Sequence, residues 1–253
     1  MFLFADQPTG IYALTLPPNA TWNETGLTVA GNWNGSAGDD LGSLNTPVSI
    51  FVDNNYVLYV TDRENHRILK YYSNSTIGTV VAGNGTAGSD SSQLNEPKGV
   101  AVDQTGAVIV ADSLNYRILR FVPGSTVGTI IATNTSSFVL GHTRDLQIDV
   151  NNNVYVTDSD FSRVLMYSAH TGLGSIVVGS NGTGTGAAQL NVPFGTYISG
   201  NNTLFIADSS NNRIQMWPPG ATSGTTVAGI TGTSGSALNQ LSRPYAVIND
   251  NNG

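Results

Sequence analysis

Short hydrophobic runs of four to six residues, each ended by Gly, Asn, Asp or Pro, follow one another along almost the whole chain. β-Branched and aromatic residues dominate these runs, as in Val154–Thr157 and Gly99–Val102. Runs of this kind between turn-forming residues predict short β-strands. No stretch of ten or more residues carries the hydrophobic period of an amphipathic helix. The pattern therefore predicts an all-β protein in which helix is nearly absent.

The hydrophobic runs recur as a repeat of about fifty residues. Each full copy has a run that ends in aspartate, an arginine five residues later, and two further runs. The aspartate–arginine pairs are Asp62/Arg67, Asp112/Arg117, Asp158/Arg163 and Asp208/Arg213. Counting the run upstream of each aspartate, one copy contains four strands, which is the content of one β-propeller blade.

The aspartate–arginine pairs span a tight turn between neighbouring strands, so carboxylate and guanidinium can meet there. A bidentate pair would fix the turn. Because the pair recurs in every full copy, and stacked repeats need the same contacts in each copy, the recurrence favours a structural role over catalysis.

We expect a single β-propeller domain covering residues 1–253, with five blades. Four full blades are predicted at about 44–83, 94–133, 140–179 and 190–229. The fifth is composite, formed by 241–253 together with 1–31.

The composite blade is predicted from the phase of the repeat. Joining Gly253 to Met1 reproduces the spacing of the uninterrupted copy Glu96–Asp112. A ring requires this match, because its last strand pairs where its first begins, so we expect closure by pairing of the N- and C-terminal strands. A trimmed or engineered repeat array would show the same phase. The composite copy keeps Asp6 but has Ile11 at the arginine position.

The second copy carries a motif found in a known family. It reads Leu-Asn-x-Pro-x-Gly-Val-Ala-Val-Asp and then Val-Ala-Asp-x-x-Asn-x-Arg-Ile, within Leu94–Phe121. This motif resembles the NHL repeat, and Asn211–Trp217 is a further close match. The resemblance implies a propeller, although the family more often has six blades, and it implies no single activity, since the family includes enzymes, nucleic-acid binders and adhesion modules. The third copy departs from the motif by reading His142-Thr-Arg-Asp-Leu146.

Charge and composition narrow the classes of partner. The chain has 10 Lys+Arg against 17 Asp+Glu, a net charge of -7, which argues against a nucleic-acid partner. No apolar stretch approaches transmembrane length, so we expect no membrane insertion. The absence of cysteine excludes disulfides and thiolate metal sites. We expect a monomer with a protein or peptide partner.

Sequons for N-glycosylation are frequent. Eight Asn-x-Ser/Thr sites occur, at Asn19, Asn23, Asn34, Asn74, Asn84, Asn134, Asn181 and Asn201, where the composition alone would give about five. Together with the low charge and Gly/Thr/Ser-rich turns, they favour an extracellular protein. Because the start Met1–Asp6 is too short for a signal-peptide core, we expect a segment of a longer secreted or membrane-anchored protein.

The starts of the innermost strands supply the candidate site at one end of the central channel. The candidate ligand-binding residues there are His142, Arg144, Lys98, Phe194, Tyr245, Glu96 and Arg243. Aromatic side chains flanked by cations suit a carboxylate-bearing or extended peptide segment. A water-filled mouth, whose residues merely close the channel, fits these residues equally well.

A metal site is not expected at this channel mouth. Of the three histidines, repeat position places His170 on the face opposite His66 and His142, and Glu96 is the only carboxylate among the residues flanking the proline position. We therefore expect no cofactor and no catalytic residue, and a non-catalytic binding or scaffolding module. The alternative is a metal-assisted lyase or hydrolase, because propeller enzymes that this chain resembles hold zinc or calcium at the channel mouth.

Overall fold

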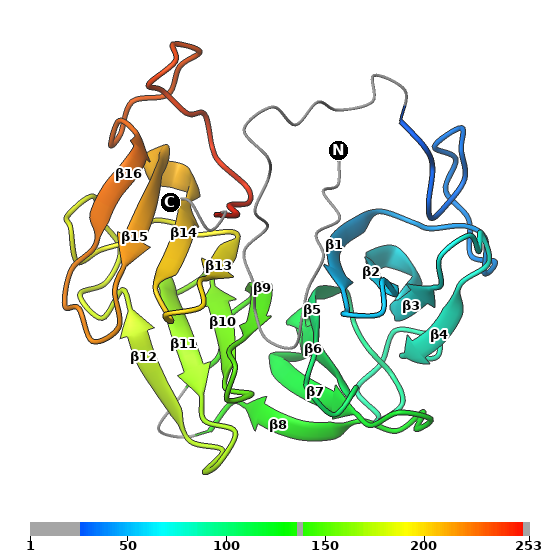
Figure 1. The fold of residues 1–253 in the computed structure, drawn as a ribbon. Coiled ribbons are helices and arrows are strands. Elements are labelled where there is room, and N and C mark those ends of the chain that lie inside the picture. The colour runs from blue at the N-terminus through cyan, green and yellow to red at the C-terminus, as the bar shows by residue number, and fades with distance from the viewer. Residues whose placement is uncertain (1–25, 136–138, 250–253) are drawn as a thin grey trace.

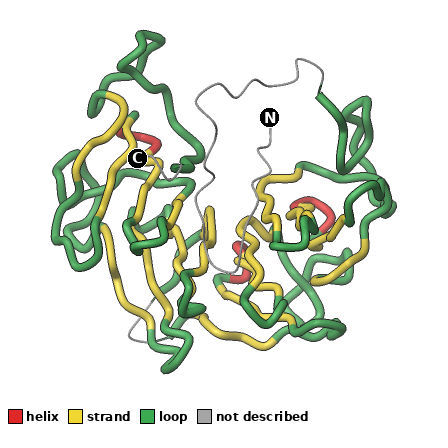
Figure 2. The backbone as a smooth tube through the Cα atoms, viewed as in Figure 1, coloured by secondary structure: helices red, strands yellow, loops and turns green. Residues whose placement is uncertain are grey.

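The computed structural model describes residues 26–135 and 139–249. Within these ranges the chain forms sixteen strands and three three-residue 3-10 turns. The turns are η1 (Arg63–Asn65), η2 (Ser113–Asn115) and η3 (Ser209–Asn211), and Figure 2 shows how little helix they add to the strands. The all-β prediction is confirmed. No helix of the described ranges has the length and apolar character to span a membrane.

The strands form four antiparallel sheets, each with four strands in sequence order. The first sheet contains β1 (Pro47–Val52), β2 (Leu58–Asp62), β3 (Arg67–Tyr71) and β4 (Thr79–Ala82). The second contains β5 (Pro97–Val102), β6 (Val108–Asp112), β7 (Arg117–Phe121) and β8 (Thr129–Thr133). The third contains β9 (Thr143–Ile148), β10 (Val154–Asp158), β11 (Arg163–Tyr167) and β12 (Gly174–Val178). The fourth contains β13 (Thr196–Ile198), β14 (Leu204–Asp208), β15 (Arg213–Trp217) and β16 (Thr225–Gly229).

The four sheets follow one another in an arc, with β1, β5, β9 and β13 nearest the centre (Figure 1). Consecutive inner strands contact each other, which is the blade arrangement of a β-propeller. Because antiparallel strands connect at alternate ends, the turns between second and third strands and the loops between blades lie on one face. We call this the clamp face, and the other, with the remaining hairpin turns, the hairpin face.

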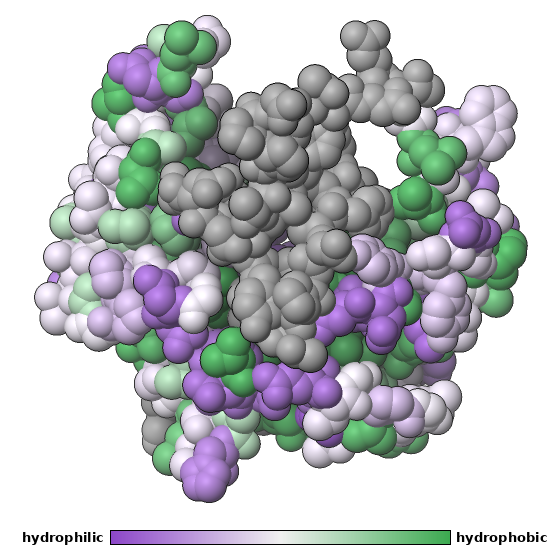
Figure 3. All heavy atoms as spheres, viewed as in Figure 1, coloured by the Kyte–Doolittle hydropathy of each residue, from purple (hydrophilic) through white to green (hydrophobic). Residues whose placement is uncertain are grey.

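Hydrophobic side chains pack between neighbouring sheets. Between the first and second sheets, Tyr59 packs in one cluster with Val100, Val108 and Phe121. A sheet with a neighbour on either side is covered on both faces, which explains why its strands read as nearly continuous hydrophobic runs. On the surface that Figure 3 shows, hydrophilic and hydrophobic side chains are interspersed.

The repeated aspartate–arginine pair forms in each described sheet and is buried in all but the third, where Arg163 is partly exposed. Arginine Nε donates to aspartate Oδ2 at 2.7 Å for Arg67, 2.7 Å for Arg117, 3.0 Å for Arg163 and 2.8 Å for Arg213. The prediction of a structural pair is confirmed, but for Arg67, Arg117 and Arg213 the expected bidentate geometry is wrong. Their terminal nitrogens donate instead to backbone carbonyls 24 to 28 residues earlier.

We call each aspartate–arginine pair, with its backbone contacts, the clamp. The second blade shows which segments the clamp joins. Arg117 donates to the carbonyls of Ser89, Asp90 and Gln93, while Asp112 accepts from the backbone N–H of Asn95 through its second oxygen, at 2.6 Å. The pair thereby joins the turn after β6 to the loop that leads into β5. Burial raises the pKa of Asp112, and hydrogen bonds from Asn115, Asn95 and Arg117 offset only part of that effect. We conclude that the clamp specifies the position of the loop more than it adds free energy.

The predicted composite blade falls largely on residues 1–25 and 250–253, which lie outside the described residues. Of its parts, Pro244–Asn249 forms no strand in the structure. The segment nevertheless lies against the fourth sheet, since the N–H of Gly195 donates to the carbonyl of Tyr245 at 2.9 Å. Five blades and closure of the ring stay predictions.

Candidate functional site

A left-handed residue precedes the inner strand of the first, second and fourth blades. Its φ is 52° at Thr46, 45° at Glu96 and 47° at Val192. Arg243, which precedes the strand-free segment Pro244–Asn249, also has a φ of 45°. This conformation is uncommon for residues other than glycine, above all for β-branched Thr46 and Val192. It turns the chain sharply at the clamp face, just before the position that carries the candidate side chains.

A hydrogen bond from the neighbouring blade holds this turn. The acceptor is the side chain of the left-handed residue that follows the neighbouring blade's second strand. Its partner is a backbone N–H: Glu96 donates to His66 Nδ1 at 3.2 Å, Val192 to Ser162 Oγ at 3.1 Å, and Arg243 to Asn212 Oδ1 at 3.0 Å. We call this contact the interblade latch.

Three candidate residues form a continuous row at the channel mouth. Arg144, Phe194 and Tyr245 occupy the same repeat position in three successive copies. The Arg144 guanidinium lies 4.6 Å from the centre of the Phe194 ring, and the Phe194 and Tyr245 rings lie 4.4 Å apart. Tyr245 is exposed. A cation over an aromatic face is attractive, most strongly when it is partly desolvated.

Lys98 adds a second positive charge from the equivalent position of the second blade. Burial lowers the pKa of Lys98, and the charge of Arg144 lowers it further, although Glu96 acts in the opposite direction. Within residues 26–135 and 139–249, no carboxylate lies within ion-pair distance of Lys98 or Arg144. The two cations are therefore close enough to repel, and neither forms an ion pair with a described carboxylate.

The other candidates are held by different partners. His142 Nδ1 lies 2.6 Å from Asp160 Oδ2, and His142 Nε2 lies 3.2 Å from the Tyr116 hydroxyl. Burial alone would raise the pKa of Asp160, but hydrogen bonds from the His142 backbone and ring hold it below its ordinary value. Glu96 lies 4.0 Å from Arg63 Nε. Arg243 is exposed, and its backbone makes the latch described above.

The described residues contain no group of three His, Cys, Asp or Glu side chains placed to hold a metal ion. His66 and His142 lie on the clamp face, while exposed His170 lies in the turn between β11 and β12 on the hairpin face. The sequence-based placement of the three histidines is confirmed.

Sequence reasoning missed Asp145, a half-buried carboxylate next to Arg144. Its Oδ2 accepts from the backbone N–H of Thr196 in the next blade at 2.8 Å, and its Oδ1 accepts from that of Leu146 at 2.9 Å. Burial raises the pKa of Asp145 to about 6. The signal was the glycine that the third copy lacks: Asp145 stands where the second copy has Gly99, whose missing side chain lets the third blade's backbone approach closely.

The comparisons with known proteins now bear on this geometry. The NHL repeat family matches residues 94–121. This segment is an NHL repeat. A comparison with curated protein sequences finds no match.

Solved structures with a similar fold perform different tasks. A streptogramin B lyase is similar at a TM-score of 0.54 and 17% identity, over 79% of this chain and 57% of the lyase. A chain of a nidogen/laminin complex is similar at a TM-score of 0.58 and 17% identity, over 80% of this chain and 68% of its own length. A gluconolactonase from Xanthomonas campestris is similar at a TM-score of 0.57 and 13% identity, over 76% of this chain and 66% of the gluconolactonase. The NHL-type propeller fold is thereby shown, and this chain spans little more than half of the lyase.

Replacing Asp145 by Asn should remove one pH dependence of stability. The folded-state pKa of about 6 lies above the ordinary value near 4, so this group's contribution to stability is present below about pH 4 and is lost as pH rises through 6. Between pH 4 and pH 7 the free energy of unfolding of Asp145→Asn should rise by about 1–3 kcal/mol relative to that of the unsubstituted protein, as measured by urea unfolding. The exposed Asp39→Asn is the control; a difference for Asp145→Asn that stays constant with pH would refute the assignment.

Proposed function

We propose that this protein is a non-catalytic binding module that takes an acidic, extended peptide of a partner protein at the clamp face. The observation that carries the proposal is the row of Arg144, Phe194 and Tyr245 beside Lys98. The row joins two aromatic rings to two positive charges that form no ion pair with a described carboxylate.

The charge arrangement supports an anionic ligand. The chain as a whole is acidic, with a net charge of -7, so this cationic pair departs locally from the surface around it. Burial and the Arg144 charge already lower the pKa of Lys98. A carboxylate placed between the two cations would relieve their repulsion and form charge-assisted hydrogen bonds with both.

The aromatic rings support a peptide rather than a small anion alone. Aromatic anchors beside an arginine are the side chains that most often dominate binding energy at protein interfaces. Backbone hydrogen bonds from Phe194 to Ala207 and from Gly195 to Tyr245 tie the two ring-bearing segments to the fourth sheet and to each other, which lowers the conformational entropy lost on binding. The nidogen/laminin complex shows that a fold of this kind occurs in a protein complex.

A metal-assisted lyase or hydrolase is the second candidate. The pair His142–Asp160 favours it, because a carboxylate bound to Nδ1 fixes an imidazole for proton transfer or metal binding. Fold neighbours include a lyase and a gluconolactonase. The binding proposal is preferred because His142 Nε2 contacts Tyr116 and no third ligand joins the pair among the described residues.

We also propose an extracellular location, which the exposed glycosylation sequons support. Six of the eight sequons fall on described residues, and all six asparagines are exposed: Asn34, Asn74, Asn84, Asn134, Asn181 and Asn201. Exposure is what attachment of a glycan requires.

The binding proposal predicts that Arg144→Ala combined with Phe194→Ala weakens peptide binding at least tenfold. A fluorescein-labelled ten-residue Glu-rich peptide is titrated by anisotropy against the protein, beside its Gln counterpart. We expect the unsubstituted protein to prefer the Glu peptide. In the double variant, loss of a desolvated cation–aromatic pair and of a charged contact should reduce the free energy of binding by about 1.5–3 kcal/mol.

The matched control is Lys70→Ala combined with Tyr72→Ala. It removes a cation–aromatic pair of the first sheet, in which Lys70 of β3 lies 5.0 Å from the ring centre of Tyr72, the residue after that strand. We expect this variant to bind as the unsubstituted protein does. Equal affinity of the Arg144/Phe194 variant and the control, with both folded by circular dichroism, would refute the proposed site.

Native mass spectrometry separates the binding module from the metal-dependent alternative. For the binding module we expect one species near 26.5 kDa, unchanged by EDTA. A divalent ion that EDTA removes, and that His142→Ala no longer retains, would instead support the lyase or hydrolase. His170→Ala is the control, since that histidine lies on the hairpin face.

We also propose that the ring has five blades and closes between its termini. The loop after β16 supports this, because its bonds repeat those of the other interblade loops: Gly235 N–H donates to the carbonyl of Leu241, as Gly88 does to Leu94. Its latch to Asn212 is complete. No described side chain donates to the carbonyls of Ser236, Ala237 and Gln240, which the clamp arginine of a fifth blade would bind.

Closure in this register predicts that Ile11→Arg stabilises the protein. Ile11 stands at the arginine position of the composite copy, so the new guanidinium would pair with Asp6 and bind the loop carbonyls. We expect Tm to rise by about 2–4 °C, measured by differential scanning fluorimetry. Asp6→Asn should cancel the gain. The control Ile77→Arg places the same charge at an exposed position of the first blade; an equal effect of both variants would contradict closure.

A further inference from the structure

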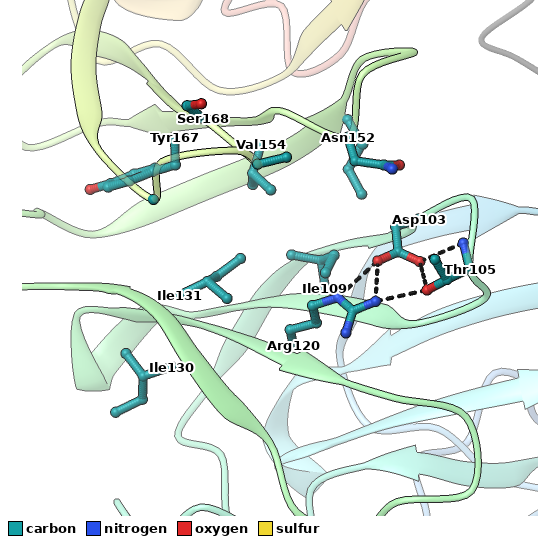
Figure 4. Close-up of a pocket in the computed structure, with 13 residues that line it drawn as sticks. Asp103, Thr105, Ile109, Arg120, Ile130, Ile131, Asn152, Val154, Tyr167 and Ser168 are labelled. Carbon is teal, nitrogen blue, oxygen red and sulfur yellow. Dashed lines mark hydrogen bonds and ion pairs between the residues drawn. The ribbon is translucent and has the colours of Figure 1, made fainter.

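A pocket of about 510 Å³ opens between the second and third sheets. Figure 4 shows Ile109, Ile130 and Ile131 on one wall and Val154 and Tyr167 on the other. Turn residues Asp103, Thr105, Asn152 and Ser168 border it, so it lies toward the hairpin face, away from the peptide site proposed above.

Comparison of the blades explains why the pocket lies at this junction. The second position of β6 is Ile109, where β2 has Tyr59, β10 has Tyr155 and β14 has Phe205. Its cross-strand partner is Ala101, where the other sheets have Phe51, Gln147 and Tyr197. The second blade therefore lacks the aromatic ring, and the large partner, that the other described blades place there.

The tyrosines show what belongs in such a space. Tyr59 packs between its own sheet and the next, in one cluster with Val108 and Phe121, and its hydroxyl lies 3.4 Å from Asp53 Oδ2. Tyr155 repeats the arrangement, with its hydroxyl 3.4 Å from Asp149 Oδ2. A phenol between two sheets, bonded to the carboxylate of the hairpin turn, is thus the arrangement of these blades.

The second blade keeps the carboxylate and pairs it with a cation. Asp103 stands at the position of Asp53 and Asp149. Arg120 binds it through Nε at 2.9 Å and a terminal nitrogen at 2.7 Å, and that nitrogen also donates to Thr105 Oγ1 at 2.7 Å. The dashed lines of Figure 4 mark this polar end of an otherwise apolar pocket.

We propose that this pocket binds a small phenol supplied from solution. Its ring lies between Ile109 and Val154, in the space that a tyrosine fills in the first and third blades. Its hydroxyl donates to the Asp103 carboxylate and accepts from Arg120. Ring burial supplies most of the affinity and the ion pair selects an aryl alcohol over a plain hydrocarbon.

The test uses 4-methylphenol, which is the tyrosine side chain itself, with toluene as the analogue that lacks the hydroxyl. Both are titrated into the ¹⁵N-labelled full chain and followed by amide chemical shifts. We expect saturable shifts confined to residues around 101–109, 148–154 and 167–172, with a Kd on the order of 1 mM for 4-methylphenol and at least fivefold weaker binding of toluene.

Two variants decide whether the pocket is responsible. Ile109→Tyr introduces the tyrosine of the first and third blades, so it should abolish binding of 4-methylphenol and raise Tm. Ile77→Tyr adds the same side chain at an exposed site and should change neither the binding nor Tm. Arg120→Met, the residue of β11 and β15 at this position, should remove the preference for 4-methylphenol over toluene, and it serves also if Ile109→Tyr fails to fold. No saturable shift at 10 mM, shifts elsewhere, or an unaltered preference in Arg120→Met would overturn the proposal.

Discussion

The repeated arginine of each described blade joins parts of the chain that lie far apart in the sequence. Through Nε it binds the aspartate that ends the second strand, and in three blades its terminal nitrogens hold carbonyls 24 to 28 residues earlier. Each loop between the described blades buries one leucine completely (Leu94, Leu140 or Leu190), and the rest of the loop is rich in Gly, Ser, Thr and Asn. A charged side chain with several fixed donors can position the rest of the loop, because each donor needs its own acceptor in a defined direction. The clamp thereby sets where the next inner strand begins.

The candidate site depends on that placement. Once the loop is held, the interblade latch fixes a left-handed turn at Glu96, Val192 and Arg243, two residues before Lys98, Phe194 and Tyr245. The third copy, which carries Arg144, lacks this turn, and its His142 N–H donates to Asp160 instead. The fold leaves the identity of the side chain at this position free, and lysine, arginine, phenylalanine and tyrosine occupy it in successive copies.

Periodicity explains which features the sequence predicts. Strands and aspartate–arginine pairs recur in every full copy, so the pattern indicated them, and Arg144, Phe194 and Tyr245 followed from their common repeat position. The carbonyl partners of the arginines leave no trace, because backbone oxygens are the same in every residue. Asp145 and Ile109 are departures from the repeat, and a departure shows its effect only when the neighbouring sheet is in place. The composite blade has no described partner strand, which leaves its closure to experiment.

The interblade latch has a direction. At three junctions one blade offers a side-chain acceptor to the segment that follows, which supplies the backbone donor, so these junctions are head to tail. Between the second and third blades a side-chain contact replaces the latch, from the Tyr116 hydroxyl to His142 Nε2. Such junctions close into a ring only when the rotation per unit divides a full turn. Duplication of one fifty-residue unit would copy both halves of the junction at once, and the new unit would fit between any two old ones. Growth of the ring by gene duplication therefore requires no new interface, only a small change in the angle at every existing one.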